Sequence, residues 1–252
     1  MVKRLIINAD DFGMTEGVTN GIIDCHRDGV LTSTTLLVNA PFTEYALEEA
    51  KKYPDLGVGI HLATTYGRPL VAGEKSFTDA HGNFKLVTSY PNRWVDVDPD
   101  ELYEEWHAQF ERFIELAGKL PTHIDSHHHV HLNPNHHKVV LKLAKLYDVP
   151  VRQMHTHDGK LVETGYEPMY FKGDFYGEDL TVAHITDALH LDVPVMEIMT
   201  HPAYLDELTY ELSSYRVPRM REMTILRSPE LKDFIKNNDI ELIDFSGLMK
   251  KE

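Results

Sequence analysis

The chain has 252 residues, of which 26% are charged and 42% hydrophobic, and its formal net charge is −15. This composition is typical of a globular protein, and the length suits one α/β barrel of about 250 residues. The excess of negative charge argues against binding to nucleic acid or to an anionic membrane. The single cysteine, Cys25, excludes an intrachain disulfide bond. We therefore expect a single domain over residues 1–252.

The N-terminal segment does not resemble a signal peptide. Its apolar run covers only residues 5–7, far fewer than the roughly 7–15 residues of a signal-peptide core. Elsewhere, no segment approaches the roughly 20 apolar residues of a membrane span. We expect a cytoplasmic protein without a membrane partner.

Short apolar runs alternate with longer amphipathic segments along the chain. In chain order we predict a strand at 4–8, a helix at 15–29, a strand at 33–39, a helix at 42–54, a strand at 56–62, a helix at 98–118, a strand at 122–127, a helix at 133–148, a strand at 149–153, a helix at 180–190, a strand at 193–201, a helix at 228–238 and a strand at 240–245. Segments 64–97 and 154–179 are predicted to be long loops. Such alternation is typical of a parallel sheet with right-handed crossovers. The fold class is therefore α/β, and we predict a TIM-like (β/α) barrel, seven-stranded and irregular.

Polar side chains suited to metal chemistry come at the ends of the predicted strands. They are Asp10, Asp11, His61, His127 and His201. In βα barrels the C-terminal ends of the strands carry the active site. Neutral imidazole is the commonest metal ligand in proteins, and a mixed set of histidine and aspartate suits a catalytic metal. The sequence therefore predicts a metal site at this rim.

The stretch 123–131 reads HIDSHHHVH and has five histidines in nine residues. A solvated surface tract is the alternative explanation, but the apolar Ile124 and Val130 argue against it. Strand alternation would place alternate residues on one side, whereas a helical turn would bring His127 and His131 together. Which of these histidines binds the metal stays open at this point.

Asp10 and Asp11 are neighbours in an extended segment, so their side chains are expected to point to opposite sides. We therefore expect one of the two to bind the metal and the other to act as a general base. Alternatively, a carboxylate here caps the following helix.

His201 precedes Pro202, which favours an extended backbone. It is either a turn residue or a general acid. Arg68 either contacts the substrate or forms a surface salt bridge.

Four blocks of the sequence resemble the YdjC-like carbohydrate deacetylases, a family that includes the chitooligosaccharide deacetylases. The blocks are NADDFG at 8–13, GIHLATTYGRPL at 59–70, THIDSHHHVHLNP at 122–134 and EIMTHPAY at 197–204. They occur in the family's order, and Ala203 is the single departure, at a position where glycine is also common. The resemblance implies a TIM-like barrel, a divalent metal and hydrolysis of an N-acetyl group from an N-acetylglucosamine-containing oligosaccharide, with or without a phosphate.

Carried over by motif position, the resemblance assigns Asp11, His61 and His127 as metal ligands and Asp10 as the base. His201 is the acid by analogy with related polysaccharide deacetylases. We also predict substrate contacts for three residues, which are Arg68, Asp125 and His131. We expect one metal ion, Mg²⁺ or Zn²⁺, although the ligand set also fits Mn²⁺, Co²⁺ and Fe²⁺.

The function predicted from the sequence is that of a metal-dependent carbohydrate N-deacetylase with a small oligosaccharide as substrate. One alternative is a metal-dependent hydrolase of another amide or of a phosphoester. Another is a non-catalytic barrel that binds a metal or a sugar. A homodimer is expected because barrels of this size often pair, although no feature of the sequence fixes the interface.

Overall fold

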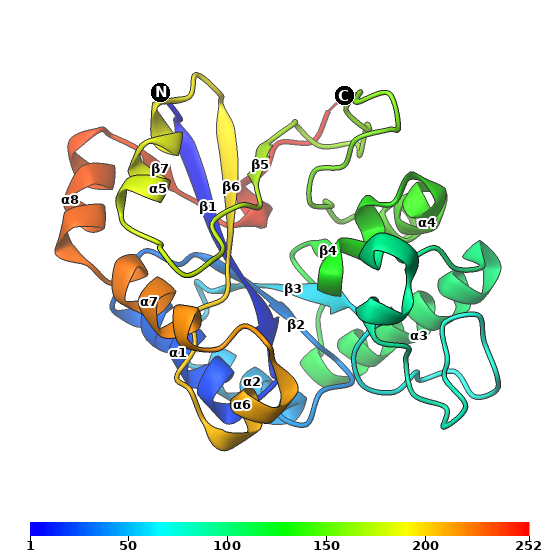
Figure 1. The fold of residues 1–252 in the computed structure, drawn as a ribbon. Coiled ribbons are helices and arrows are strands. Elements are labelled where there is room, and N and C mark those ends of the chain that lie inside the picture. Colours follow the sequence, from blue (N-terminus) through cyan, green and yellow to red (C-terminus); the bar gives the residue numbers. More distant parts are fainter. Residues whose placement is uncertain (252) are drawn as a thin grey trace.

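All the strands belong to one parallel sheet in the computed structural model, which describes residues 1–251. The last residue of the predicted domain 1–252 lies outside the described residues. The strands are β1 (Arg4–Phe12), β2 (Ser33–Leu36), β3 (Gly57–Leu62), β4 (Ile124–Ser126), β5 (Tyr170–Lys172), β6 (Val195–Thr200) and β7 (Glu241–Leu242). Their order is β4-β3-β2-β1-β6-β5, with β7 paired to β1. The sheet curls into a half-barrel (Figure 1), which confirms the predicted α/β class and the irregular, seven-stranded TIM-like architecture.

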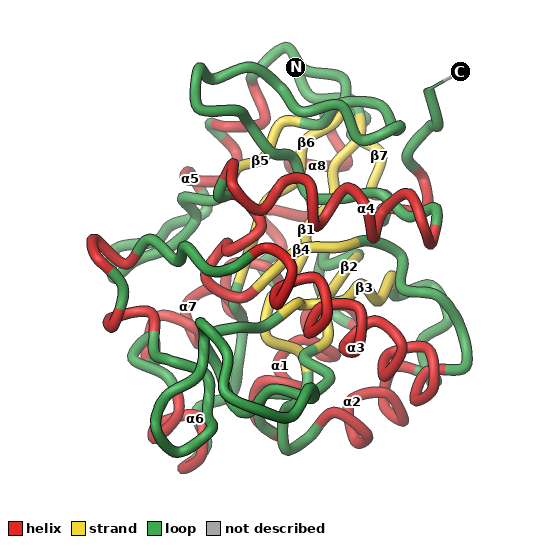
Figure 2. The backbone as a smooth tube through the Cα atoms, turned by 90° about the vertical axis from the view of Figure 1, so that its right-hand side faces the viewer, coloured by secondary structure: helices red, strands yellow, loops and turns green. Residues whose placement is uncertain are grey.

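Helices surround this sheet. They are α1 (Glu16–Arg27), α2 (Thr43–Ala50), α3 (Pro99–Ala117), α4 (His137–Tyr147), α5 (Ala183–Thr186), α6 (Glu207–Leu212), α7 (Val217–Leu226) and α8 (Pro229–Asn237). Helices α3 and α4 pack together beside β3 and β4, whereas α7 and α8 lie on the side of β1 and β6 (Figures 1 and 2). Within residues 1–251, no helix combines the length and the apolar character needed to cross a membrane.

Helix ends follow local signals in the sequence. Thr15 begins α1, where its side chain accepts a hydrogen bond from the backbone N–H of Val18. Asp98 does the same for two N–H groups at the start of α3, and Gly118 ends that helix in the left-handed conformation. These residues satisfy backbone groups that a helix leaves unpaired at its ends.

Strand β1 is the centre of the sheet. Over Arg4–Ala9 it pairs with β6, and from Asn8 onward it pairs with β2, while β7 pairs with its first two residues. Every residue from 5 to 12 is buried. Because β1 lies in the middle of the sheet, its C-terminal end delivers Asp10 and Asp11 to the interior of the half-barrel.

The predicted strand at 149–153 is wrong. Only Val151 forms a bridge, to Ile124 of β4, because β4 has just three residues and offers little length for pairing. The predicted helix at 180–190 is also wrong in extent, since α5 has four residues and a 3-10 turn follows it. Strand β5 lies inside segment 154–179, which was predicted to be a loop.

The sequence patterns gave no sign of α6 or α7. Helix α7 buries Arg219 and Glu222 together with apolar residues. Charged side chains on its inner face interrupt the apolar periodicity by which an amphipathic helix is recognised. The reason for these buried charges lies in the site described below.

Close packing around β3 explains a glycine in that strand. A Cβ atom on Gly59 would lie 2.4 Å from the ring of His123. His123 is fully buried and stacks on Phe245 with 3.5 Å between ring centroids. The imidazole therefore has little room to move away.

We expect Gly59→Ala to lower the free energy of unfolding by about 2 kcal/mol or more, because overpacking of a core typically costs about 1–3 kcal/mol. Urea unfolding followed by circular dichroism measures the change. Gly118→Ala is the control: its Cβ meets open space at a φ of +66°, so only a backbone cost of about 1 kcal/mol is expected. Equal stability of Gly59→Ala and the wild type would contradict this account.

Candidate metal centre and active site

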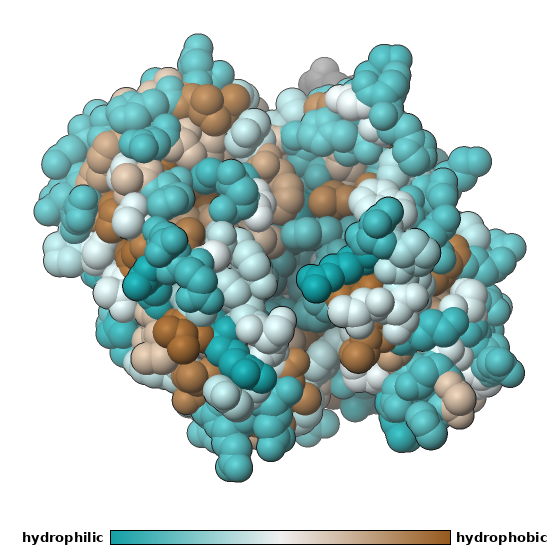
Figure 3. Space-filling model, viewed as in Figure 1, coloured by the Kyte–Doolittle hydropathy of each residue, from teal (hydrophilic) through white to brown (hydrophobic). Residues whose placement is uncertain are grey.

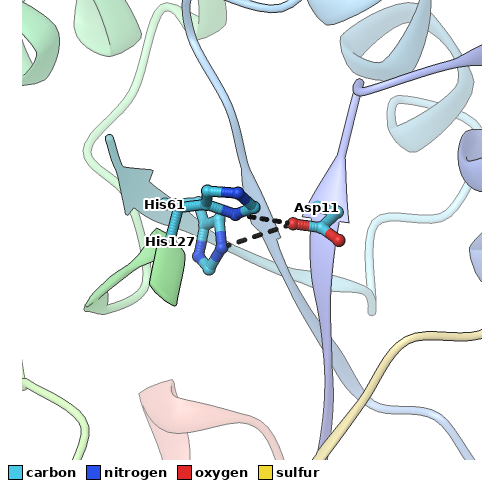
Figure 4. Close-up of side chains that lie close together, drawn as sticks. All are labelled: Asp11, His61 and His127. Atoms are coloured by element: carbon cyan, nitrogen blue, oxygen red, sulfur yellow. Dashed lines mark hydrogen bonds and ion pairs between the residues drawn. The ribbon is translucent and has the colours of Figure 1, made fainter. Parts of the chain in front are cut away.

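Three side chains from separate segments converge at the end of the sheet (Figure 4). Asp11 Oδ1 lies 3.0 Å from His127 Nδ1 and 3.6 Å from His61 Nε2. The ligand atoms of the three residues lie within 4.8 Å of one another. Asp11 and His61 are buried, and His127 is nearly so. The structure thus brings together the three residues that the family resemblance implies as metal ligands, in a group that could hold a metal ion.

The backbone around these residues adopts uncommon conformations. Asp11 has a φ of +73°, and His128 and His129, which follow His127, have φ values of +55° and +58°. Left-handed backbone is uncommon outside glycine and is enriched at functional sites. At Asp11 it coincides with an irregularity in the pairing of β1 with β2 between Ala9 and Phe12. The conformation turns Asp11 toward the two histidines.

The histidine-rich stretch spreads its rings in different directions. The strand ends at Ser126, and a 3-10 turn over 127–132 replaces the alternation expected of a strand. His127 faces Asp11, whereas His128 Nδ1 lies 2.8 Å from Thr65 Oγ1. His131 is fully buried, with Nδ1 2.6 Å from Ser126 Oγ. Among the five histidines, His127 is therefore the one placed with Asp11 and His61.

Asp125 orients His61. Its Oδ1 lies 2.7 Å from His61 Nδ1, and its Oδ2 accepts a hydrogen bond from Thr35 and forms an ion pair with Arg152. A proton on His61 Nδ1 satisfies this contact and leaves the Nε2 lone pair free on the side of Asp11. Carboxylates commonly fix the tautomer of metal-binding histidines in this way.

A buried arginine joins three carboxylates behind the site. Arg152 donates to both oxygens of Asp10 at 2.8 and 3.0 Å and to Glu197 at 2.7 Å, and it forms an ion pair with Asp125 Oδ2 at 2.9 Å. All four side chains are almost completely buried. Burial opposes the ionisation of Asp10, but the charge of Arg152 outweighs it and holds the pKa of Asp10 well below its usual range. Asp10 is therefore a carboxylate at neutral pH.

A second arginine, Arg219, forms an ion pair with Asp11. Arg219 of α7 donates to Asp11 Oδ2 at 2.7 Å. Burial opposes the ionisation of Asp11, but the charge of Arg219 and a hydrogen bond from His127 keep its pKa well below the usual value. Arg219 occupies one oxygen of Asp11 and leaves Oδ1 facing the two histidines.

The site favours positive charge. Burial disfavours a charged His61, but Asp125 and Asp10 outweigh this and raise its pKa to about 10. The same negative field would stabilise a divalent cation held by His61 Nε2, His127 Nδ1 and Asp11. One carboxylate and two imidazoles form a donor set suited to Zn²⁺ and related metals. The residues present thus fit a metal ion.

His201 lies just beyond β6, next to two tyrosines. Its ring is edge-on to Tyr176 and Tyr215, with centroids 5.6 and 5.8 Å away. Its backbone N–H donates to Glu222, and within residues 1–251 its buried Nδ1 has no partner. Burial lowers the pKa of His201 to about 4, although Asp10 and Asp11 oppose the shift. His201 is therefore neutral near pH 7 in this state.

Two of the residues predicted to contact the substrate, Asp125 and His131, are not exposed to solvent. Asp125 is fully buried and engaged by His61, Thr35 and Arg152, and His131 is fully buried beside Ser126. Arg68 lies on an exposed loop, where its Nε donates to Asn83 at 2.9 Å. Their role toward a substrate stays a prediction.

Sequence reasoning missed the two arginines, Arg152 and Arg219, and two buried glutamates, Glu197 and Glu222. Arg152 and Glu197 each interrupt an apolar run, and a buried charge requires a partner. That rule marks both residues as candidates for a buried ion pair. No comparable signal exists for Arg219 and Glu222, because the helix that carries them was not predicted.

The chain is similar to known proteins over nearly its whole length. Residues 4–237 match the family described as YdjC-like protein. A "Carbohydrate deacetylase" of Brevibacillus brevis is 44% identical over 97% of this chain and 99% of its own length. A "Chitooligosaccharide deacetylase" of Yersinia pestis is 39% identical over 97% of this chain and 99% of its own length. A crystal structure from Enterococcus faecalis, provisionally described as a cellobiose-phosphate cleavage protein, is 35% identical with a TM-score of 0.84 and covers 97% of this chain and 98% of that one.

The half-barrel and its Asp/His cluster define an α/β protein with a candidate catalytic metal site. The chain belongs to the YdjC-like family. The family resemblance that the four sequence blocks indicate is therefore confirmed.

We expect Asp125→Asn to weaken metal binding about 10–100-fold, because loss of a carboxylate that orients a ligand histidine has effects of this size. Isothermal titration with Zn²⁺ measures the change, and Asp158→Asn, at an exposed loop position, is the matched control. Unchanged metal affinity together with a raised KM for substrate would instead support the substrate contact predicted from the sequence.

We expect Glu197→Gln to change the pH dependence of stability. Burial raises the pKa of Glu197 from 4.5 to about 7, although Arg152 opposes the shift. A carboxyl group with a raised pKa in the folded state loses stability as the pH rises between those two values. Relative to the wild type, Glu197→Gln should therefore gain about 1–3 kcal/mol between pH 5 and pH 8.

Urea unfolding at pH 5, 6.5 and 8 measures this difference. Exposed Glu74→Gln should keep the wild-type pH dependence. If the curves of Glu197→Gln and the wild type run parallel, Glu197 does not titrate in this range.

Proposed function

We propose that this protein is a metal-dependent hydrolase that removes an N-acetyl group from N-acetylglucosamine-containing oligosaccharides of the chitobiose type. The observation that carries the proposal is the convergence of Asp11, His61 and His127 beside the ionised Asp10. The relatives named as carbohydrate and chitooligosaccharide deacetylases, which align over nearly the whole chain, support it.

Asp11, His61 and His127 would hold one divalent metal, Mg²⁺ or Zn²⁺, with Mn²⁺ or Co²⁺ as alternatives. Such an ion polarises an amide carbonyl and lowers the pKa of water. Asp125 fixes the ring of His61, and Arg219 fixes Asp11 through its other oxygen. The ligands are therefore oriented before the ion binds.

The contacts favour one metal ion over two. A second group that could hold an ion consists of Asp10, His61 and Asp125. It shares His61 with the first group, and both of its carboxylates already form ion pairs with Arg152. A phosphoesterase with several bound metals is therefore less well supported than the deacetylase.

Asp10 is the proposed base. Arg152 keeps it ionised, and Asn8 also donates to it at 3.0 Å. A carboxylate stabilised so strongly is a weak base, so proton transfer to it must accompany attack of water on the carbonyl. In this proposal Asp10 is the base and Asp11 a metal ligand. This division matches the expectation that adjacent side chains in an extended segment point to opposite sides.

His201 is the proposed acid. With a pKa of about 4 it is neutral near pH 7, so it must first gain a proton released by the reaction. Once protonated it is a strong donor to the leaving amine. The hydrogen bond from its backbone N–H to Glu222 holds the residue at the end of β6.

For the predicted substrate contacts, the geometry favours different roles. Asp125 is best placed to orient His61, and His131 to brace the turn after β4 through Ser126. Arg68 alone is exposed and could contact a polar or phosphorylated sugar. The homodimer and the cytoplasmic location likewise remain predictions.

The decisive experiment measures acetate released from N,N′-diacetylchitobiose and its 6-phosphate. Metal-stripped protein should release none, and addition of Zn²⁺, Mg²⁺, Mn²⁺ or Co²⁺ in turn should restore activity and identify the metal. His61→Ala and His127→Ala should lose activity at least about 100-fold, because removal of a ligand disrupts the centre on which transition-state stabilisation depends.

His81→Ala, at an exposed loop position, is the matched control and should keep full activity. Asp10→Asn should bind metal but lose turnover about 100- to 10,000-fold, which is typical for loss of a general base. A non-catalytic binding protein would be indifferent to that substitution. Metal binding without acetate release from either sugar would contradict the proposed function.

A further inference from the structure

Two stacked tyrosines lie beside the candidate active site. The rings of Tyr176, which follows β5, and Tyr215, just before α7, have centroids 3.8 Å apart and planes inclined by 16°. Tyr215 is only 8% exposed, whereas Tyr176 is 51% exposed. Tyr176 therefore presents aromatic surface to solvent while its inner face is covered by Tyr215.

Hydrogen bonds fix the inner ring. The Tyr215 hydroxyl donates to Glu222 Oε1 at 2.6 Å and accepts from the backbone N–H of Gly177 at 3.1 Å. Arg219 Nε donates to the backbone carbonyl of Tyr215 at 2.8 Å. The bond to Gly177 also ties down the residue after Tyr176. The stack is thus held in place before any ligand arrives.

The stack borders the catalytic groups. Both rings meet the edge of His201 at less than 6 Å between centroids. Arg219, which contacts Tyr215, also binds Asp11 Oδ2 at 2.7 Å. One side chain therefore separates the aromatic pair from a proposed metal ligand.

The surface in this region is concave. Figure 3 shows a hollow with a hydrophilic floor between the half of the molecule that carries β1, β6 and α7 and the half that carries β4, α3 and α4. Burial raises the pKa of Tyr176, and the nearby positive charges of Arg219 and Arg93 oppose the shift. Arg93 is exposed and, within residues 1–251, forms no ion pair. The guanidinium carbon of Arg219 lies 5.8 Å from the centre of the Tyr215 ring.

We infer that Tyr176, braced by Tyr215, is a sugar-binding wall against which a pyranose ring of the substrate packs next to His201. This inference rests on the proposed function for the class of ligand. A pyranose has an apolar C–H face, so it matches a fixed and half-exposed aromatic ring next to a histidine. The pre-formed stack reduces the entropy lost on binding.

The test compares Tyr176→Ala with Tyr176→Phe and Tyr210→Ala. Tyr176→Ala should raise KM for N,N′-diacetylchitobiose about 10-fold, with a smaller fall in kcat, and should weaken equilibrium binding of the product-like glucosamine disaccharide by a similar factor. Tyr176→Phe keeps the ring and should retain most of the binding. Tyr210 is 56% exposed but stacks on Arg216 instead of His201, so its removal should change neither value.

The binding measurement separates this inference from the proposed function. If the wild type binds N,N′-diacetylchitobiose but releases no acetate, weaker binding in Tyr176→Ala alone supports the wall and overturns the activity. If the wild type releases acetate and Tyr176→Ala has unchanged KM and disaccharide affinity, the wall is overturned and the activity stands. If the wild type binds neither N,N′-diacetylchitobiose nor the glucosamine disaccharide, the proposed sugar-binding role of Tyr176 is also wrong.

Discussion

The interior of the half-barrel depends on one buried guanidinium. Arg152 bonds to Asp10 of β1, Asp125 of β4 and Glu197 of β6, three strands that are distant in sequence. Removal of one partner from a buried ion pair typically costs about 3–5 kcal/mol, because a charge is left uncompensated. The polar interior is therefore specific to one arrangement of the strands. All three carboxylates pair with the same cation, and burial raises the pKa of Asp125 and Glu197 although Arg152 opposes the shift.

This constraint allows two neighbouring aspartates to remain ionised at the end of β1. Two carboxylates near one histidine would ordinarily repel, and one of them would take up a proton. Here Asp10 is paired with Arg152 and Asp11 with Arg219. The two arginines come from different segments, so each aspartate side chain has its own cationic partner. Metal ligation and proton acceptance can thus belong to adjacent residues.

The fold class and the cluster of metal-ligand candidates could be predicted because both depend on short-range patterns. Apolar runs ended by polar residues mark the strand ends, and His127 stands at such an end. The two arginines depend on long-range pairing. Arg152 lies within segment 149–153, for which a strand is predicted but which forms only a bridge, and Arg219 lies on α7, whose inner face is charged. Local periodicity carries no information on such partners, although Glu197 within an apolar strand shows that one must exist.

The sheet and the later segments contribute different parts of the site. The candidate ligands come from β1, β3 and the end of β4, whereas His201, Tyr215 and Tyr176 come from connections after β5 and β6. Glu222 joins the second set, since it accepts from both His201 and Tyr215. Arg219, one turn earlier on the same helix, donates to Asp11. Burial raises the pKa of Glu222 to about 8, so it can keep these bonds without a buried negative charge. Helix α7 thus connects the aromatic pair proposed to bind the sugar with the proposed metal ligand Asp11, through Arg219 and Glu222.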